Sequence, residues 1–214
     1  YYYSQFVDDY EDKMSHFEYR GELANQAAEA ISTKIDKAIF AGVQATVAVA
    51  AVADQKAGTV VTNADVHGGA TAEARGDAMV DAIFDANAAF NANDIPMDGR
   101  VCVTRPENYY EIVRSQKAVN RDFTNGNGGI DSGTVLNIAG TPILWSNHLP
   151  AWVTTTNQLE ALFFTPECYG VVKFMDITSE ANYLPEKLGT LMTSYYALGM
   201  GTLNPGASAT IMSA

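Results

Sequence analysis

The feature that most constrains the fold is a long helical pattern near the start of the chain, from about Asp8 to Phe40. Apolar or small residues recur there at alternating steps of four and three, which draws one stripe along an α-helix. The stripe consists of Tyr10, Met14, Phe17, Gly21, Ala24, Ala28, Ile31 and Ile35. At about 1.5 Å per residue such a helix spans roughly 50 Å, which exceeds the diameter of a small domain. We therefore expect a spine helix along an elongated molecule.

Both ends of this helix carry local signals. Its first turn is crowded with acidic residues, which the helix dipole favours there: Asp8, Asp9, Glu11 and Asp12. Gly42 predicts the C-terminal end. Leu23 lies off the stripe, on a second and weaker apolar face that is expected to meet a neighbour, together with Tyr19, Ala27 and Ala30. A coiled coil is the alternative, but the small residues of the stripe would form a weak seam for one.

Two long stretches of the sequence carry no acidic or basic side chain apart from His148: Ser132–Leu159 and Leu188–Ala214. The chain as a whole has a net charge of -12, and its 18% of charged residues is below the ~25% typical of soluble domains. Neutral surface in an acidic chain indicates regions that other chains cover. A compact monomer rich in Ala and Gly is the alternative. In the second stretch, alternate residues from Leu191 to Leu198 would point to opposite faces of a strand, and neither set contains a charged side chain. A strand there is therefore expected to be covered on both faces.

The remaining pattern mixes helices and strands without a regular βαβ repeat, which predicts an α+β fold. Helices are expected over Ala72–Phe90 and Pro106–Gln116, and Thr104 with Glu107 has the spacing of a capping box at the start of the second. Strands are expected at Arg100–Thr104, Thr134–Ile138, Ile143–Ser146, Ala161–Phe164, Val171–Met175 and in the segment Leu191–Met212.

None of the residues that could carry chemistry forms a recognisable site. The histidines His16, His67 and His148 lack metal-ligand spacing. Cys102 and Cys168 form no CxxC pair and are interpreted as small buried hydrophobic residues in a reducing compartment. A catalytic pair of Cys102 with His148 has no support from spacing.

Two further patterns have an ordinary structural explanation. The acidic run from Asp8 to Asp12 is interpreted as helix capping and not as a metal cluster. Gly199-Met200-Gly201 lacks the third glycine and the strand–helix context of a nucleotide loop. We therefore assign no catalytic, cofactor-binding or metal-binding residue. The lack of Lys/Arg stripes argues against adhesive binding to nucleic acid, although it leaves open the enclosure of nucleic acid without gripping it.

Four segments in collinear order resemble one protein family. Asp9-Tyr10-Glu11-Asp12 with Met14, His16, Arg20, Glu22, Gln26 and Asp36 is similar to the spine helix of major capsid proteins from short-tailed, autographivirus-type bacteriophages. The other matching segments are Asp98-Gly99-Arg100-Val101 with Thr104-Arg105-Pro106-Glu107-Asn108-Tyr109, Asn137-Ile138-Ala139-Gly140 with Asn147-His148-Leu149-Pro150, and Tyr196-Ala197-Leu198-Gly199-Met200-Gly201-Thr202-Leu203-Asn204-Pro205. Together they cover nearly the whole chain.

The resemblance implies the Hong Kong 97-like capsid fold, with a peripheral domain that holds the spine helix and an axial domain at capsomer centres. It places a peripheral domain with the spine helix at 1–43, an axial domain at 44–160, and the peripheral sheet and C-terminal strand at 161–214. In the family, an N-terminal arm and an extended loop precede the spine helix. This chain opens with Tyr1-Tyr2-Tyr3 near that helix, so we expect it to be the ordered or processed part of a longer protein, without arm and loop. Residues 117–133 match no family segment.

By the same resemblance, the function is that of a structural subunit, without enzymatic activity or cofactor. It would assemble as pentamers and hexamers into the icosahedral capsid around phage double-stranded DNA. The implied partners are copies of itself, with scaffolding and portal proteins during assembly and no membrane. The implied location is the virion, and the host cytoplasm during assembly. The alternatives are a bacterial nanocompartment shell of the same fold and a small hydrolase that uses Cys102 or Cys168.

Overall fold

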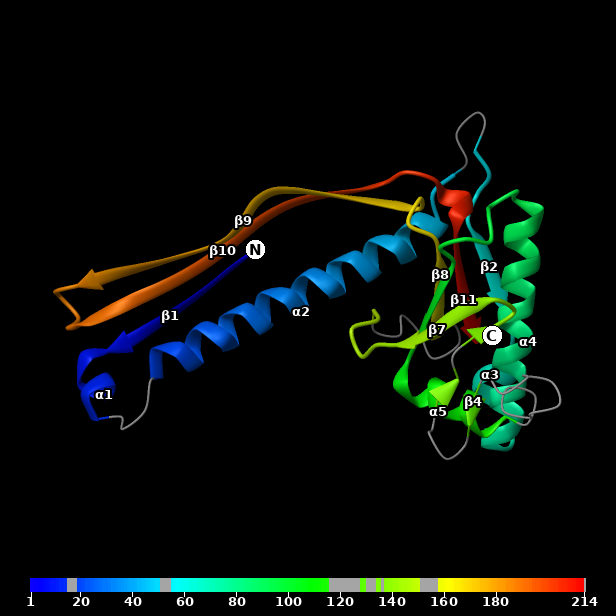
Figure 1. Ribbon diagram of the computed structural model, residues 1–214, viewed down its shortest axis with the longest axis horizontal. Coiled ribbons are helices and arrows are strands. Elements are labelled where there is room, and N and C mark those ends of the chain that lie inside the picture. The colour runs from blue at the N-terminus through cyan, green and yellow to red at the C-terminus, as the bar shows by residue number, and fades with distance from the viewer. Residues whose placement is uncertain are drawn as a thin grey trace. The chain divides into compact units, whose positions relative to one another are not determined.

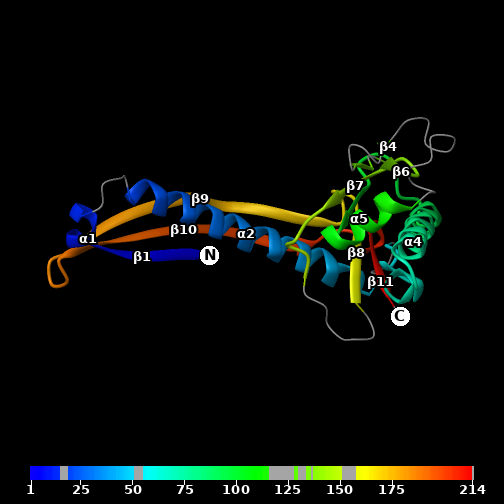
Figure 2. The same cartoon turned by 90° about the horizontal axis from the view of Figure 1, so that it is seen from below.

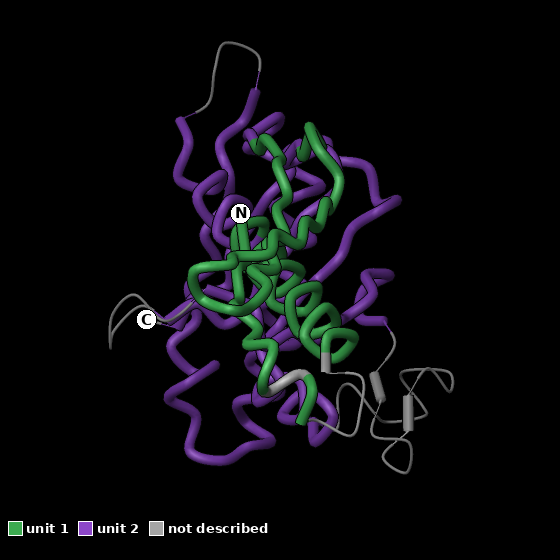
Figure 3. The backbone as a smooth tube through the Cα atoms, turned by 90° about the vertical axis from the view of Figure 1, so that its left-hand side faces the viewer, with its two compact units in different colours: residues 1–39, 171–200 green, residues 40–170, 201–214 purple. Residues whose placement is uncertain are grey.

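The structure is a computed structural model that describes residues 1–14, 19–50, 55–115, 128–129, 134–135, 137–150 and 158–213. The chain divides into two compact units, each built from two separate segments. Unit 1 comprises residues 1–39 and 171–200, and unit 2 comprises residues 40–170 and 201–214 (Figure 3). No helix in these ranges has the length and apolar character needed to cross a membrane.

Unit 1 combines a three-stranded sheet with one long helix. Its elements are β1 (Tyr2–Asp8), α1 (Asp9–Met14), the first part of α2 (Tyr19–Val47), and most of β9 (Tyr169–Leu184) and β10 (Gly189–Thr202). The strand order is β1-β10-β9, with β1 antiparallel to β10 from Tyr2↔Tyr195 to Asp8↔Gly189. Within this unit α2 runs alongside β9 and β10 (Figure 2).

Unit 2 is built around a six-stranded mixed sheet of order β2-β11-β8-β3-β7-β6. These strands are β2 (Thr59–Thr62), β3 (Val101–Thr104), β6 (Asn137–Ile138), β7 (Thr141–Trp145), β8 (Gln158–Phe164) and β11 (Ser208–Ser213). β4 (Gly128–Gly129) and β5 (Thr134–Val135) form a separate pair. The helical elements are α3 (Asp65–Gly68), α4 (Ala72–Ala92), α5 (Pro106–Arg114) and the 3-10 turn η1 (Pro205–Ala207).

The core of unit 2 lies where α4 and α5 pack on this sheet (Figure 1). Phe90 on α4 meets Phe163 on β8 edge to face, with ring centroids 4.8 Å apart, and both rings are fully buried. Ile83, Ile112 and Ile211 are also without solvent exposure. The helices are placed by local signals. Thr71 caps α4 by accepting a hydrogen bond from the Ala74 amide at 3.1 Å, and Pro106 occupies the first turn of α5.

The first predicted helix differs from the observed elements in three ways. The chain up to Asp8 is a strand, and the helical pattern is divided into α1 and α2, with residues 15–18 outside the described ranges. α2 also continues through Gly42 to Val47. A β-carbon at Gly42 would collide with the ring of Tyr169, so this glycine allows a close approach instead of ending the helix. Gly42 and Tyr169 both belong to unit 2.

Two predictions in the rest of the chain also need correction. No side chain caps α5: its N-cap residue is Arg105, and the Thr104 hydroxyl instead donates to the backbone oxygen of Glu160 at 3.3 Å. β9 extends well beyond the expected Val171–Met175. The prediction was too short because the second half of β9 is an exposed and polar edge strand that lacks apolar alternation. The other predicted helices and strands, over Ala72–Phe90, Pro106–Gln116, Arg100–Thr104 and Ile143–Ser146, agree with observed elements to within a few residues.

The division into units also differs from the ranges expected from the sequence. Residues 161–170 and 201–214 group with the central part of the chain and not with its beginning. The reason is strand pairing: β11 is the second strand of the six-stranded sheet and pairs with β2 on one side and with β8 on the other. The assignment of the units to peripheral and axial positions in a shell remains a prediction.

Candidate functional site

Cys102 is enclosed by the central sheet of unit 2. It lies on β3, opposite Ile143 of β7 and Phe163 of β8, and has no solvent exposure. Burial raises the pKa of its thiol to about 12, so the thiolate is scarcely populated at neutral pH. A thiol that is both uncharged and inaccessible cannot attack an external substrate in this conformation. The interpretation of Cys102 as a small buried hydrophobic residue is confirmed.

Cys168 has a similar environment just beyond β8. It is 1% exposed, and burial raises the pKa of its thiol to about 11. Among the histidines, His67 is exposed on α3, and His148 lies in the segment after β7, where its amide donates to the Ser146 hydroxyl at 3.1 Å. His16 lies outside the described residues.

Asp8 of the acidic run lies at a helix start, and the glycine pair lies in a strand. The Asp8 carboxylate accepts a hydrogen bond from the Tyr10 amide at 2.9 Å, as a residue at a helix start does. Gly199 and Gly201 lie within β10 and are followed by η1, not by the helix that a nucleotide loop requires. In the part of the chain that the structure describes, no three His, Cys, Asp or Glu side chains lie close enough together to hold a metal ion.

Glu160 is a buried carboxylate that the sequence interpretation missed. It is 1% exposed in the middle of β8, where its Oε2 accepts from Asn108 of α5 at 2.7 Å and its Oε1 lies 3.8 Å from Nδ1 of His67. Burial lowers the pKa of the nearby Arg105, and attraction to Glu160 opposes this shift. A glutamate inside the apolar run Gln158–Phe164 was the available signal. These contacts tie α3 and α5 to β8, which is a structural role.

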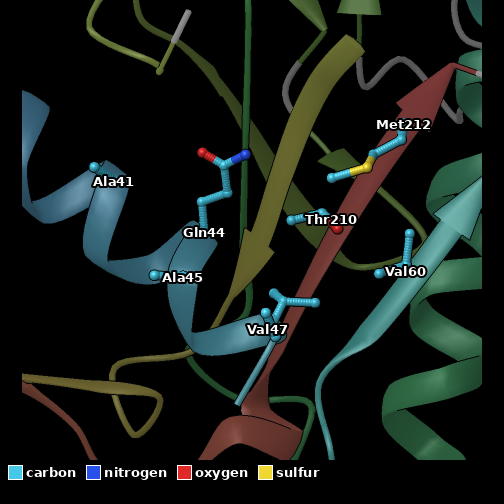
Figure 4. Close-up of a pocket in the computed structure, with 8 residues that line it drawn as sticks. Ala41, Gln44, Ala45, Val47, Val60, Thr210 and Met212 are labelled. Carbon is cyan, nitrogen blue, oxygen red and sulfur yellow. The ribbon is translucent and has the colours of Figure 1, made fainter. Parts of the chain in front are cut away.

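A shallow apolar groove of about 300 Å³ lies in unit 2 between the last turns of α2 and the strands β2 and β11. Figure 4 shows the side chains that line it, which come from Ala41, Gln44, Ala45, Val47, Val60, Thr210 and Met212. The hydroxyl of Thr210 is buried there without a hydrogen-bond partner among the described residues. The residues that line it include no acidic or basic side chain and no cysteine, so the groove brings together no acid–base pair and no thiol.

The buried face of α2 in unit 1 coincides with the predicted stripe only in part, because Ile31 belongs to both. Leu23, Ala27 and Ile31 are 4%, 5% and 1% exposed, whereas Ala24 and Ala28 of the stripe are exposed. The predicted stripe alternates steps of four and three, whereas the buried residues follow two successive steps of four, from Leu23 through Ala27 to Ile31. Leu23 and Ala27, assigned to a weak second face, therefore form the main contact.

Comparisons with known proteins agree with the fold. The family model described as "Gp10A-like: Major capsid protein" matches residues 3–212. The major capsid protein of Enterobacteria phage T3 is 25% identical over an alignment that covers 96% of this chain and 68% of that protein. The minor capsid protein of the same phage is also 25% identical over 96% of this chain, which spans only 55% of its length.

Solved capsid structures share the fold over the whole chain. In the capsid structure of Cyanophage P-SCSP1u, a chain with 26% identity superposes with a TM-score of 0.86, covering 100% of this chain and 72% of that one. In the mature capsid of bacteriophage PhiM1, the identity is 18% and the TM-score 0.80, with 99% and 69% covered. The expected α+β, Hong Kong 97-like fold is confirmed. The chain therefore belongs to the Gp10A-like major capsid protein family, as a structural subunit of phage capsids.

Proposed function

We propose that the protein assembles as pentamers and hexamers into a closed icosahedral shell that encloses phage double-stranded DNA. The observation that supports this most strongly is the family match over residues 3–212, together with whole-chain similarity to the capsid subunit of Cyanophage P-SCSP1u. Unit 1 takes the peripheral position in each capsomer and unit 2 the axial position. Scaffolding and portal proteins act during assembly in the host cytoplasm, and the completed shell is the virion capsid.

The charge of the chain fits a container for DNA. Each copy carries a net charge of -12, so a shell of many copies repels the phosphate backbone instead of gripping it. DNA is therefore enclosed without sequence-specific binding. The contents of the particles distinguish this proposal from a protein-filled nanocompartment. Particles isolated from infected cells are expected to contain nuclease-resistant double-stranded DNA.

The assembly proposal is tested on the full-length protein. Electron microscopy of the protein expressed with its scaffold is expected to show closed shells with fivefold and sixfold capsomers. Light scattering that detects only monomers at high concentration, with scaffold present, would contradict the proposal. Particles that hold protein but never DNA, also when isolated from infection, would favour the nanocompartment.

A further part of the proposal is that the protein has no catalytic activity. Both cysteines are buried with pKa values raised by burial, to about 12 at Cys102 and about 11 at Cys168, and this supports the capsid subunit over the hydrolase alternative. The variants Cys102→Ala, Cys168→Ala and His148→Ala are expected to alter stability or assembly only. A thiol-dependent turnover that persists in homogeneous protein and disappears in Cys102→Ala or Cys168→Ala would refute this part alone.

A further inference from the structure

The three-stranded sheet of unit 1 has one face that α2 covers. In the register, Val7 lies opposite Thr190, and side chains directly opposite each other share a face. Val7 and Thr190 are 1% and 8% exposed, and α2 of the same unit runs along the sheet (Figure 2), so we assign this side to the helix. Every second residue of β1 and β10, starting from Val7 and Thr190, therefore points toward the helix.

The residues between them form the opposite side, which we call the open sheet face. In the register of β1 and β10 it consists of Tyr2, Ser4, Phe6, Asp8, Gly189, Leu191, Thr193 and Tyr195, and alternation along β10 adds Ala197. Two side-chain contacts extend the assignment to β9: Ser179 bonds to Ser194 on the helix side at 2.8 Å, and Tyr195 donates to Glu180 on the open face at 3.0 Å. By alternation from Glu180, the open face of β9 includes Val172, Phe174 and Asp176.

The open sheet face is rich in exposed apolar and aromatic side chains. Phe174 is 82% exposed, Tyr2 and Val172 are each 71% exposed, and Phe6 is 39% exposed. Phe6 lies close over Gly189, where a β-carbon would collide with its ring, so the missing side chain of Gly189 makes room for the aromatic ring on this face. Aromatic residues and low charge distinguish the buried centres of protein interfaces from ordinary surface.

The free edge of β9 is less suited to pairing than this face. Lys173 and Asp176 of this edge strand form an exposed ion pair, with Nζ and Oδ2 2.7 Å apart. Charged side chains on an edge strand hinder the addition of another strand there. Contact through the face is therefore favoured over contact through the edge.

The charges indicate what kind of partner fits. On the open sheet face, β1 and β10 contribute one charged residue, Asp8 at the last position of β1, and the charges on β9, Asp176 and Glu180, are also acidic, so the charges lie at the end and along one margin of the face and leave its centre neutral. Nucleic acid would find no cation there. A second copy carries the same net charge of -12 and can approach closely only where the contact surface is neutral. We infer that the open sheet face binds a second copy of this chain in the assembled shell, an inference that rests on the proposed capsid function.

The test uses single cysteines introduced on alternate faces of β9 in the full-length protein. The two thiols within residues 1–214 are buried and therefore react slowly with a maleimide at neutral pH, and the parent protein gives the background labelling. Val172→Cys and Phe174→Cys report on the open sheet face, and Lys173→Cys and Met175→Cys are matched controls on the other face of the same strand. All four positions are exposed in the single chain, so the variants are expected to fold like the parent protein.

Labelling rates are compared between unassembled protein and purified particles. At positions 172 and 174 the rate is expected to fall about tenfold or more on assembly, because a packed interface excludes water and reagent. At positions 173 and 175 it is expected to change less than about threefold, since side chains alternate in direction. Particles with unchanged rates at 172 and 174 would overturn the inference and leave the capsid function intact. Equal protection at all four positions would overturn the face assignment. Failure to form particles at all would refute the proposed function, and the inference with it.

Discussion

Arg100 places a cationic side chain inside unit 2, where it is 2% exposed. Its guanidinium donates to the side-chain oxygens of Asn87 and Asn91, at 2.9 and 2.8 Å, and to the backbone oxygens of Pro96 and Ile95. It also lies 5.5 Å from the centre of the Phe90 ring. Burial lowers the pKa of Arg100, but a guanidinium stays charged at any pH that a protein experiences. One side chain thus joins the end of α4, the following turn and the start of β3.

We expect Arg100→Met to lower the free energy of unfolding by about 3 kcal/mol, because it leaves several buried acceptors without donors. Urea denaturation measures the change. Arg114→Met, at an exposed position in the last turn of α5, is the control and is expected to cost less than about 0.5 kcal/mol. Equal costs for the two variants would show that the network around Arg100 contributes nothing beyond surface charge.

At the scale of the element, the buried face of α2 determines which substitutions disturb unit 1. Leu23→Ala and Ile31→Ala remove large buried side chains, at 4% and 1% exposure, and are each expected to cost about 2–4 kcal/mol through lost burial and a residual cavity. Ala24→Ser, on the exposed part of the predicted stripe, and Lys34→Ala are expected to cost less than about 0.5 kcal/mol. Thermal or urea unfolding followed by circular dichroism measures all four. Similar losses at Ala24 and Leu23 would mean that the helix packs through the other face.

The contact between α4 and α5 depends on a glycine. A β-carbon at Gly76 would fall on the backbone carbonyl of Glu111, which cannot move without shifting α5. Gly76→Ala is therefore expected to lower stability by about 2 kcal/mol, although alanine is the better helix former. Gly68→Ala, in α3 with open space around it, is the control and is expected to leave stability unchanged or raise it by up to about 1 kcal/mol. A stabilised Gly76→Ala variant would show that the two helices separate easily.

At the scale of the whole molecule, net charge opposes association. Each copy carries -12, and unfavourable long-range repulsion must be overcome before neutral surfaces meet. Raising the ionic strength from about 0.01 to 0.15 M shortens the screening length from about 30 to 8 Å. Assembly, followed by light scattering, is therefore expected to become faster and more complete over this range. Assembly that slows with added salt would indicate that attractive ion pairs between copies dominate.

Much of unit 2 could be predicted from the sequence, because its elements are delimited by local chemistry. Thr71 before α4, Pro106 at the start of α5 and the consecutive apolar residues of β3 act within a few positions of themselves, and each predicted element is present. The burial of Cys102 and Cys168 was predicted for the same kind of reason, since an unpaired cysteine without neighbouring ligands behaves as a small hydrophobic residue.

Only the tertiary structure decided the contacts between segments that lie far apart in the sequence. The sequence contains large and small apolar residues on two sides of α2, and the sheet of unit 1 determines that Leu23, Ala27 and Ile31 are the ones buried. Strand β1 gains its hydrogen bonds from β10, nearly the whole chain away, and β11 joins unit 2 because β8 and β2 flank it. The missing side chain of Gly42 lets the Tyr169 ring pack against α2. The Thr104 hydroxyl donates to the backbone oxygen of Glu160 instead of capping α5. Caps and turns depend on neighbours in sequence, whereas the buried face of a helix and the pairing of a strand depend on which distant segment completes the contact.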